Sequence, residues 1–178
     1  MSLETEYFRI VVGRFKSIKD LGDKAIEQLS EEDIHWRLNE ESNSVAIIVK
    51  HLSGNMVSRW IDILHSDGEK PNRNREQEFS DTVSSVTEMK EMLDMGWNTL
   101  FDALGHLNGE DLLRSVCIRG ESHIVLDAIE RQLAHYAYHI GQIVYIGKQI
   151  KKKEWKSLSI PKGHSDAYLE QMLKKHQS

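Results

Sequence analysis

Two histidines, His135 and His139, lie four residues apart in the segment Gln132–Lys148, which reads QLAHYAYHIGQIVYIGK. The apolar residues of this segment recur at the spacing of an amphipathic helix. At about 100° per residue, a spacing of four places both imidazole rings on one helix face, one turn apart. Imidazole is the commonest metal ligand among side chains. The pair is therefore half of a candidate metal site that needs a ligand from another helix.

One further histidine, His51, differs from the others because it lies inside a second predicted helix, beside apolar residues. His51, Asn55 and Arg59 follow one another at successive turns and enter the apolar line of that helix obliquely. Polar groups in an apolar stripe are costly unless a partner satisfies them. A bound ion with a small pocket beside it would do so, which makes His51 the candidate third ligand.

The spacing of the histidines is also compatible with roles other than metal binding. A pair spaced by four can serve packing or a subunit interface without holding an ion. Two other metal patterns fit less well. Tyr136-Ala137-Tyr138 lacks the glutamate that follows the first histidine of the zincin motif. Only Glu32 with His35 matches the Glu-x-x-His pairs of di-iron bundles.

Four long amphipathic segments are predicted to be the helices that position these residues. They are Leu3–Leu29, Val45–Leu64 (capped by Asn43-Ser44), Asp81–Leu104, and a segment from Glu121 or Ser122 to Lys148. The predicted fold class is all-α: a four-helix bundle with short extra helices in the connections and at the C-terminus. A chain of 178 residues is long enough for one sizeable core, so a single domain over residues 1–178 is expected.

The connections carry weaker signals. A short helical piece is expected around Trp36 and a final helix over Ser165–Lys175. Glu69–Ser80 is polar and broken by Pro71, so we expect a loop with few contacts. Ser115–Arg119 is expected to be at most briefly extended, and the sequence has no convincing set of strands.

The composition excludes several classes of protein. A net charge of −5 without a dense basic face argues against nucleic-acid binding. The longest apolar run, Val45–Val49, is too short to span a membrane. The N-terminal sequence MSLETEY has no apolar signal region, and the single cysteine, Cys117, suits a reducing compartment. A cytoplasmic location is therefore expected.

The chain resembles the DinB/YfiT-like superfamily of metal-binding four-helix bundles. In that superfamily one histidine of the second helix and an H-x-x-x-H pair of the fourth bind a divalent metal; His51, His135 and His139 match here. The resemblance extends over nearly the whole chain to a branch of uncharacterised bacterial proteins. The stretches that carry it are GNMVSRWIDILHSDGEKPNRNREQEF, IRGE, RQLAHYAYHIGQIVYIGK and WKSLSIPKG.

Three neutral imidazoles can hold Zn²⁺ or Ni²⁺, and also Fe²⁺ or Mn²⁺, while leaving coordination positions open. By the resemblance, characterised relatives include thiol S-transferases and a thiol-dependent isomerase that use a low-molecular-weight thiol such as bacillithiol or mycothiol. The favoured hypothesis is therefore transfer of such a thiol to a small-molecule electrophile, with the thiolate held by the metal.

Arg59 and Asn55 are the candidate catalytic residues beside the metal. Arg59 would orient an anionic group of the substrate, because a guanidinium binds a carboxylate bidentately; the alternative is an ion pair with Asp62 or a neighbouring helix. Asn55 would orient His51 or a bound water, or cap a buried polar contact. Cys117 is expected to be a buried, inert thiol.

Two other functions are alternatives. A metal-dependent hydrolase would use metal-bound water, but Glu121 and Glu130 are not one turn from the histidine pair, so no general base is obvious. A non-catalytic, metal-binding or stress-associated protein is the other alternative. By the resemblance a homodimer is expected, with Trp155, Leu158 and Ile160 covering either a partner or the chain's own bundle.

Overall fold

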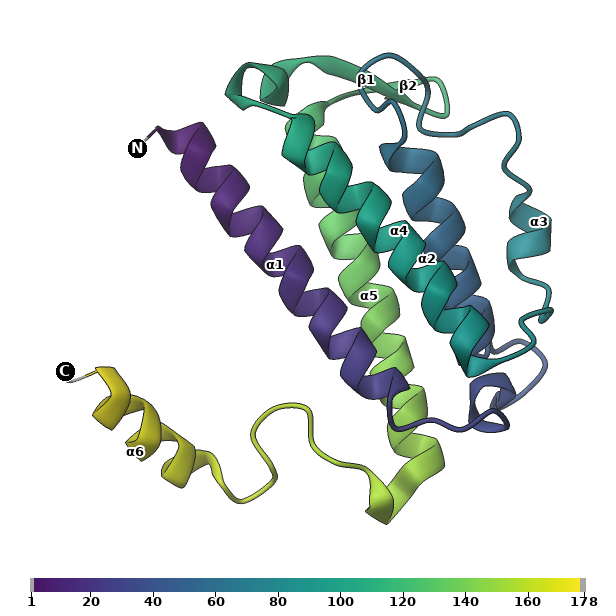
Figure 1. Cartoon of the computed structure of the whole chain (residues 1–178), viewed down its shortest axis with the longest axis vertical. Coiled ribbons are helices and arrows are strands. Elements are labelled where there is room, and N and C mark those ends of the chain that lie inside the picture. Colours follow the sequence, from purple (N-terminus) through teal and green to yellow (C-terminus); the bar gives the residue numbers. More distant parts are fainter. Residues whose placement is uncertain (1, 177–178) are drawn as a thin grey trace.

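The computed structural model describes residues 2–176, in which four long helices pack side by side (Figure 1). They are α1 (Leu3–Ile26), α2 (Val45–Trp60), α4 (Val86–His106) and α5 (Val125–Lys151). α2 packs mainly against α4, α1 packs mainly against α5, and α2 also contacts α5. The predicted helical bundle is confirmed. Its neighbouring helices α2 and α5 are the two that carry the candidate metal ligands.

Serine side chains cap the N-termini of α2 and α4. The Ser44 hydroxyl accepts a hydrogen bond from the backbone N–H of Ile47 at 3.3 Å, as the sequence predicts. The Ser85 hydroxyl accepts one from the first turn of α4. α4 therefore begins at Val86 and not at Asp81.

Two predicted helices end earlier than their apolar periodicity indicates. α2 ends at Trp60 and not at Leu64, because Asp62 has a φ of 50°, outside the right-handed helical region. α1 ends at Ile26, because the next turn is tighter: the N–H of Leu29 bonds to the carbonyl of Ile26 at 3.0 Å.

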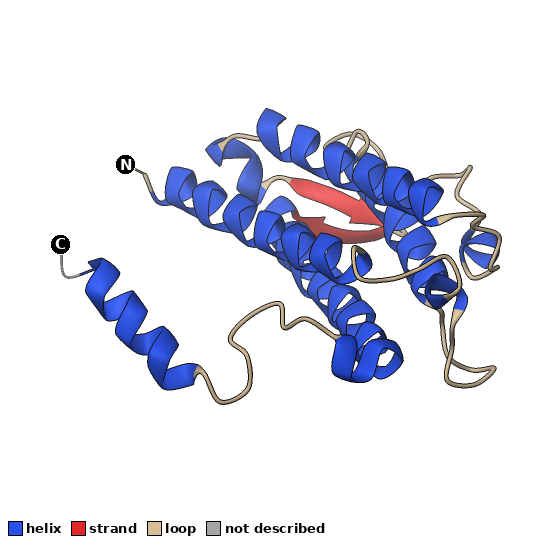
Figure 2. Cartoon of the chain, turned by 60° about the horizontal axis from the view of Figure 1, so that its bottom comes forward, coloured by secondary structure: helices blue, strands red, loops and turns tan. Residues whose placement is uncertain are grey.

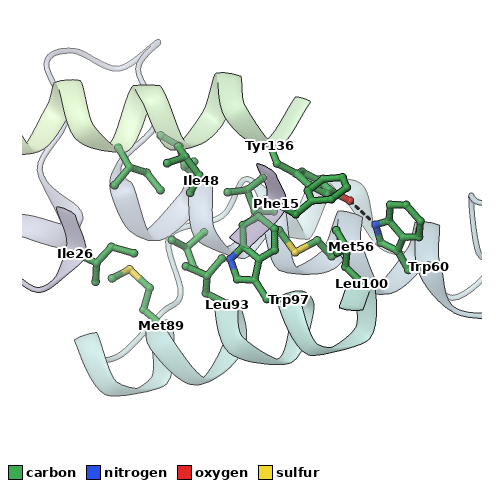
Figure 3. Close-up of a cluster of buried hydrophobic side chains, with 14 of the residues drawn as sticks. Phe15, Ile26, Ile48, Met56, Trp60, Met89, Leu93, Trp97, Leu100 and Tyr136 are labelled. Carbon is green, nitrogen blue, oxygen red and sulfur yellow. Dashed lines mark hydrogen bonds between the residues drawn. The ribbon is translucent and has the colours of Figure 1, made fainter. Parts of the chain in front are cut away.

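An aromatic cluster forms the centre of the core (Figure 3). Phe15 meets the rings of Trp60 and Trp97 edge to face, with centroid distances of 6.3 and 6.4 Å. The indole N–H of Trp60 donates to the hydroxyl of Tyr136 at 3.0 Å. Burying each large side chain stabilises the fold by roughly 1.5–3 kcal/mol. The bond to Tyr136 joins α2 to α5 beside His135, whose ring faces His51 of α2.

A small antiparallel hairpin precedes α5 (Figure 2). Strands β1 (Ser115–Ile118) and β2 (Glu121–Ile124) are joined by Arg119 and Gly120, which have φ values of 57° and 75°. Two consecutive positive φ values are typical of the tight turns that match strand twist. The brief extension over Ser115–Arg119 is therefore present, and it has a partner strand that the sequence did not indicate.

The hairpin corrects two predictions. The fourth long helix begins at Val125, because Glu121–Ile124 pair with β1 instead of continuing the helix. Cys117 is exposed and not buried, because it alternates along β1 with the buried Val116 and Ile118.

The connection between α2 and α4 also differs from expectation. It contains the short helix α3 (Arg75–Glu78), which packs beside α2, and its Glu78 is buried. The prediction of a loop with few contacts is therefore wrong. The other short pieces are 3₁₀ helices, η1 (Asp33–His35), η2 (Gly109–Leu113) and η3 (Lys152–Glu154).

The C-terminal region has two parts. Trp155 packs on α5 so closely that a Cβ on Gly147 would lie 2.6 Å from the Trp155 ring, so this residue covers the chain's own bundle. The final helix α6 (Ser165–His176) lies away from the bundle in both views (Figures 1 and 2). No described helix combines the length and apolar character needed to cross a membrane.

Candidate metal centre

Three imidazole rings meet between α2 and α5. The Nε2 atom of His135 lies 3.4 Å from Nε2 of His51 and 3.2 Å from Nε2 of His139. One ring nitrogen from each histidine lies within 4.8 Å of the others. His51 and His135 are 84 positions apart in the chain, so only the packing of α2 against α5 joins them.

The spacing of these nitrogens fits a divalent ion. Three nitrogens at ~2.0–2.1 Å from a zinc ion in tetrahedral geometry are separated from one another by about 3.3 Å. Two of the three separations, 3.2 and 3.4 Å, fall on either side of that value, and the third is within 4.8 Å. Three converging nitrogens also need a proton or a cation between them, because lone pairs repel. The cluster could therefore bind a metal and leave a coordination position open for another ligand.

The protonation of the rings favours metal binding. Burial, with added repulsion from His139 and His51, lowers the pKa of His135 to about 3. Burial also lowers the pKa of His139. Both rings are consequently neutral at pH 7, which is the form that coordinates metals.

A buried carboxylate orients His51. Nδ1–H of His51 donates to Oε2 of Glu78 at 2.9 Å, and both residues are buried. Arg73 donates to both carboxylate oxygens, from Nε at 2.7 Å and from Nη2 at 2.8 Å. Burial raises the pKa of Glu78, but the bonds from His51 and Arg73 outweigh it and hold the pKa below its ordinary value. An ionised Glu78 fixes the tautomer of His51 and leaves Nε2 free for a metal.

The close approach of Glu78 to α2 requires a glycine. A Cβ built on Gly54 would lie 2.5 Å from Oε1 and 2.9 Å from Cδ of Glu78. Gly54 is three residues after His51 and lies on the same helix face. A larger residue there would push the carboxylate away from the imidazole.

The other two histidines have different surroundings. Nδ1–H of His139 donates to Oε1 of Gln142 at 2.8 Å, and the Gln142 amide donates to the hydroxyl of Tyr138 at 3.0 Å. The Nδ1 atom of His135 is buried and has no hydrogen-bond partner among the described residues. The ring of Phe79 stacks on His51, with a centroid distance of 5.1 Å. Two of the three rings are thus held by hydrogen bonds on the side away from the shared point.

The predicted residues Asn55 and Arg59 are both buried next to this cluster but have other partners. Oδ1 of Asn55 accepts a hydrogen bond from the Tyr136 hydroxyl at 3.2 Å. Arg59 donates to the carbonyl of Gly68 and forms an ion pair with Glu69 at 3.2 Å, so its carboxylate partner is not Asp62. Among the described residues, neither Asn55 nor Arg59 is hydrogen-bonded to a histidine of the cluster.

Sequence reasoning missed Glu78, Arg73 and Gly54. All three lie in the stretch GNMVSRWIDILHSDGEKPNRNREQEF, which carries the resemblance to the DinB/YfiT-like branch without an assigned role. The presence of charged residues in that stretch was the available signal. The sequence favours a core or surface role for Gln142, whereas the structure places it on His139.

A comparison with protein families identifies the family of this chain. The family described as "Protein of unknown function (DUF1572)" matches residues 2–164. The chain belongs to this family. DUF1572 is generally placed in the DinB/YfiT-like superfamily, in agreement with the resemblance seen in the sequence. The DUF1572 match includes all three histidines and Glu78, and it ends directly before α6. No curated protein and no solved structure matches the chain.

Proposed function

We propose that this DUF1572 protein is a divalent-metal-dependent enzyme that transfers a low-molecular-weight thiol to an electrophile. His51, His135 and His139 hold the metal, with zinc or nickel as the expected ion and iron or manganese as further candidates. The observation that carries the proposal is the set of three converging imidazoles, two of them oriented by Glu78 and Gln142. When bound, such a metal keeps a thiol deprotonated at neutral pH.

The carboxylates near the cluster favour thiol transfer over hydrolysis. Among the described residues, Glu78 is the only carboxylate with a hydrogen bond to the three histidines. It accepts three hydrogen bonds from His51 and Arg73 and meets His51 at Nδ1, on the side of the ring away from the three Nε2 atoms, so it is not placed to take a proton from a metal-bound water. A hydrolase that relies on a general base besides its metal-bound water would therefore lack that base here. A thiol needs no such base, because it loses its proton to solvent when a metal holds it as the thiolate.

The transfer step is a substitution. The thiolate sulfur donates an electron pair to the electrophilic carbon, a carbon–sulfur bond forms, and the leaving group departs with the electrons of its own bond. The protein's contribution is to hold the two reactants together and to orient them.

Arg59 and Asn55 are proposed as the positioning residues of this reaction. Nε of Arg59 is buried and has no hydrogen-bond partner among the described residues, so this donor is available to an anionic group or to a water. The cavity lined by Arg59 and Gln132 has a volume of about 10 Å³, room for about one water. Asn55 acts on the site through Tyr136, which lies between His135 and the core.

Metal analysis and a thiol-conjugation assay test the proposal together. Tag-free protein is loaded with Zn²⁺ or Ni²⁺, its metal content is measured by mass spectrometry, and conjugation of bacillithiol to monochlorobimane is followed by fluorescence. We expect about one metal per chain and metal-dependent conjugation, both lost in His135→Ala. His106→Ala is the matched control, because His106 is an exposed histidine at the end of α4.

The outcomes of this experiment distinguish thiol transfer from the two alternative functions. A parent protein that binds no metal would overturn the proposal. Metal binding with hydrolysis of 4-nitrophenyl acetate and no conjugation would favour the hydrolase. Metal binding without either activity would favour a non-catalytic metal-binding protein.

We also propose that the protein forms a homodimer, as the resemblance implies. The support in this chain is α6, which lies away from the bundle (Figure 1). Its residues Tyr168, Leu169 and Leu173 are exposed. Exposed apolar residues on one short helix are typical of a surface that is covered in an assembly. Light scattering after gel filtration should give twice the mass of one chain, and a monomeric Leu169→Glu/Leu173→Glu variant would identify α6 as the contact. A monomeric parent protein would refute the dimer.

A further inference from the structure

A cleft of about 650 Å³ lies between α5 and the connection that leads into α2. Its walls are mostly apolar or aromatic; they include Trp36, Leu38, Ile48, Tyr138 and Tyr145. The volume is within the range of about 300–1,000 Å³ that is usual for small-molecule sites. The cleft is large enough to hold an organic ligand.

The cleft lies next to His139 of the candidate metal centre. Gln142 and Tyr138, which both line it, are hydrogen-bonded to each other, and Gln142 also accepts the bond from His139. The ring of Tyr138 meets the His139 ring edge to face, with a centroid distance of 4.9 Å. On the opposite wall, Ile48 precedes His51 by one turn of α2. A molecule in the cleft therefore lies next to Gln142, which holds His139, and one turn of α2 from His51.

Several large side chains of the cleft are exposed and therefore available to a ligand. Tyr138 is 62% exposed, Tyr145 is 64% exposed and Leu38 is 74% exposed. Neighbouring large apolar side chains that stay in contact with water are typical of binding surfaces. Their rings would gain both apolar burial and stacking from a flat ligand.

The charge of the lining selects among ligands. Among the described residues, Glu41 is the only charged side chain that lines the cleft, and the polar ones are Ser42, Asn43 and Gln142. An anion placed here would face a carboxylate with no cation to offset it. A neutral molecule meets no such penalty, and a cation gains from Glu41 and from the aromatic faces.

We propose that this cleft binds the electrophile, as an aromatic molecule without negative charge. The identification of the ligand as the electrophile rests on the proposed thiol transfer. The binding itself depends only on the residues of the cleft. The electrophile then lies against Tyr138 and Tyr145, next to His139 of the candidate metal centre.

Binding of three matched probes tests the charge preference. Isothermal titration of metal-free protein with 4-nitrobenzylamine, 4-nitrobenzyl alcohol and 4-nitrobenzoate compares a cation, a neutral molecule and an anion on the same ring. We expect the amine and the alcohol to bind and the benzoate to bind at least about tenfold more weakly. Benzoate that binds as tightly as the alcohol would overturn the proposal.

Variants test the location. Tyr145→Ala should weaken binding of the alcohol about fivefold, the value of one stacking contact. Leu113→Ala, at an exposed apolar residue of η2 outside the cleft, is the control and should leave the affinity unchanged. Equal affinities in the two variants would overturn the assignment.

The same measurements separate this inference from the proposed function. His135→Ala should lose the metal and still bind the alcohol. A parent protein that binds the alcohol but no metal would refute thiol transfer and leave the cleft as a binding site. A parent protein that binds metal but none of the probes would refute the cleft and leave the metal centre.

Discussion

Glu78 and His51 form a buried carboxylate–imidazole pair, with Oε2 of Glu78 2.9 Å from Nδ1 of His51. The pair is held from both sides, because Arg73 donates to both Glu78 oxygens and Gly54 leaves the space that the carboxylate occupies. An imidazole whose Nδ1–H is engaged in this way presents Nε2 in a fixed direction. The connection between α2 and α4 is therefore part of the candidate metal centre.

Loss of the Glu78 charge should weaken metal binding while the fold persists. Glu78→Gln keeps the size of the side chain but removes the charge that selects the His51 tautomer, and such changes typically cost about 10–100-fold in metal affinity. Competition with a chromogenic chelator measures the change. Glu76→Gln, at an exposed position on α3, is the control and should match the parent. Equal affinity in the two variants would show that Glu78 does not support the ligand.

A methyl group at position 54 should weaken metal binding by displacing Glu78. In Gly54→Ala the new Cβ would lie 2.5 Å from Oε1, so the carboxylate has to move away from His51. We expect weaker metal binding without loss of helicity, measured by the same chelator titration and by circular dichroism. Gly13→Ala is the control, because nothing lies within 4 Å of its added Cβ. That control should gain up to about 1 kcal/mol of stability from helix propensity and keep the parent's metal affinity.

Removal of the Tyr136 hydroxyl should lower the free energy of unfolding. Tyr136→Phe leaves the Trp60 indole N–H and the Asn55 carbonyl oxygen without their shared partner. A buried polar group without a partner costs about 1–3 kcal/mol, so urea denaturation should show a loss in this range. Tyr145→Phe, at an exposed tyrosine of the same helix, is the control. A loss no greater than in this control would mean that the Tyr136 hydroxyl is not part of a stabilising network.

An ion pair between η1 and the end of α5 should make stability depend on pH in the acid range. Burial raises the pKa of Asp33, but bonds from Lys151 and from the Ser30 backbone outweigh it and the pKa is lowered. The unfolded chain binds this proton more readily, so the contribution is complete above the unfolded pKa of about 3.8–3.9 and is lost as pH falls through the folded value. Asp33→Asn should lower the free energy of unfolding by about 1 kcal/mol at pH 7. It should also flatten the acid limb, that is, the fall of stability with decreasing pH below about pH 4.

Thermal denaturation between pH 2 and pH 7 measures this effect. Glu32→Gln, at the exposed neighbouring position, is the control and should keep the acid limb of the parent. An acid limb in Asp33→Asn as steep as that of the parent would show that the carboxyl is not responsible.

Much of the bundle and of its three-histidine cluster could be predicted from the sequence because both depend on local periodicity. Spacing of apolar residues at three and four indicates the four long helices, and Ser44 is recognisable as a cap. The spacing of His135 and His139 determines that their rings share a face. His51 stands out because a polar group inside an apolar helical stripe needs a partner.

Other features depended on contacts between distant segments, for which the sequence has no periodic signal. Glu78 is 27 positions from His51 and follows a polar, proline-broken stretch, so nothing local places it in the interior. The carboxylate partner of Arg59 is Glu69, and Cys117 is exposed because the buried face of β1 carries Val116 and Ile118 instead. Helical periodicity tells which way a side chain points from its own axis. Only the packing of one segment on another decides what it meets there.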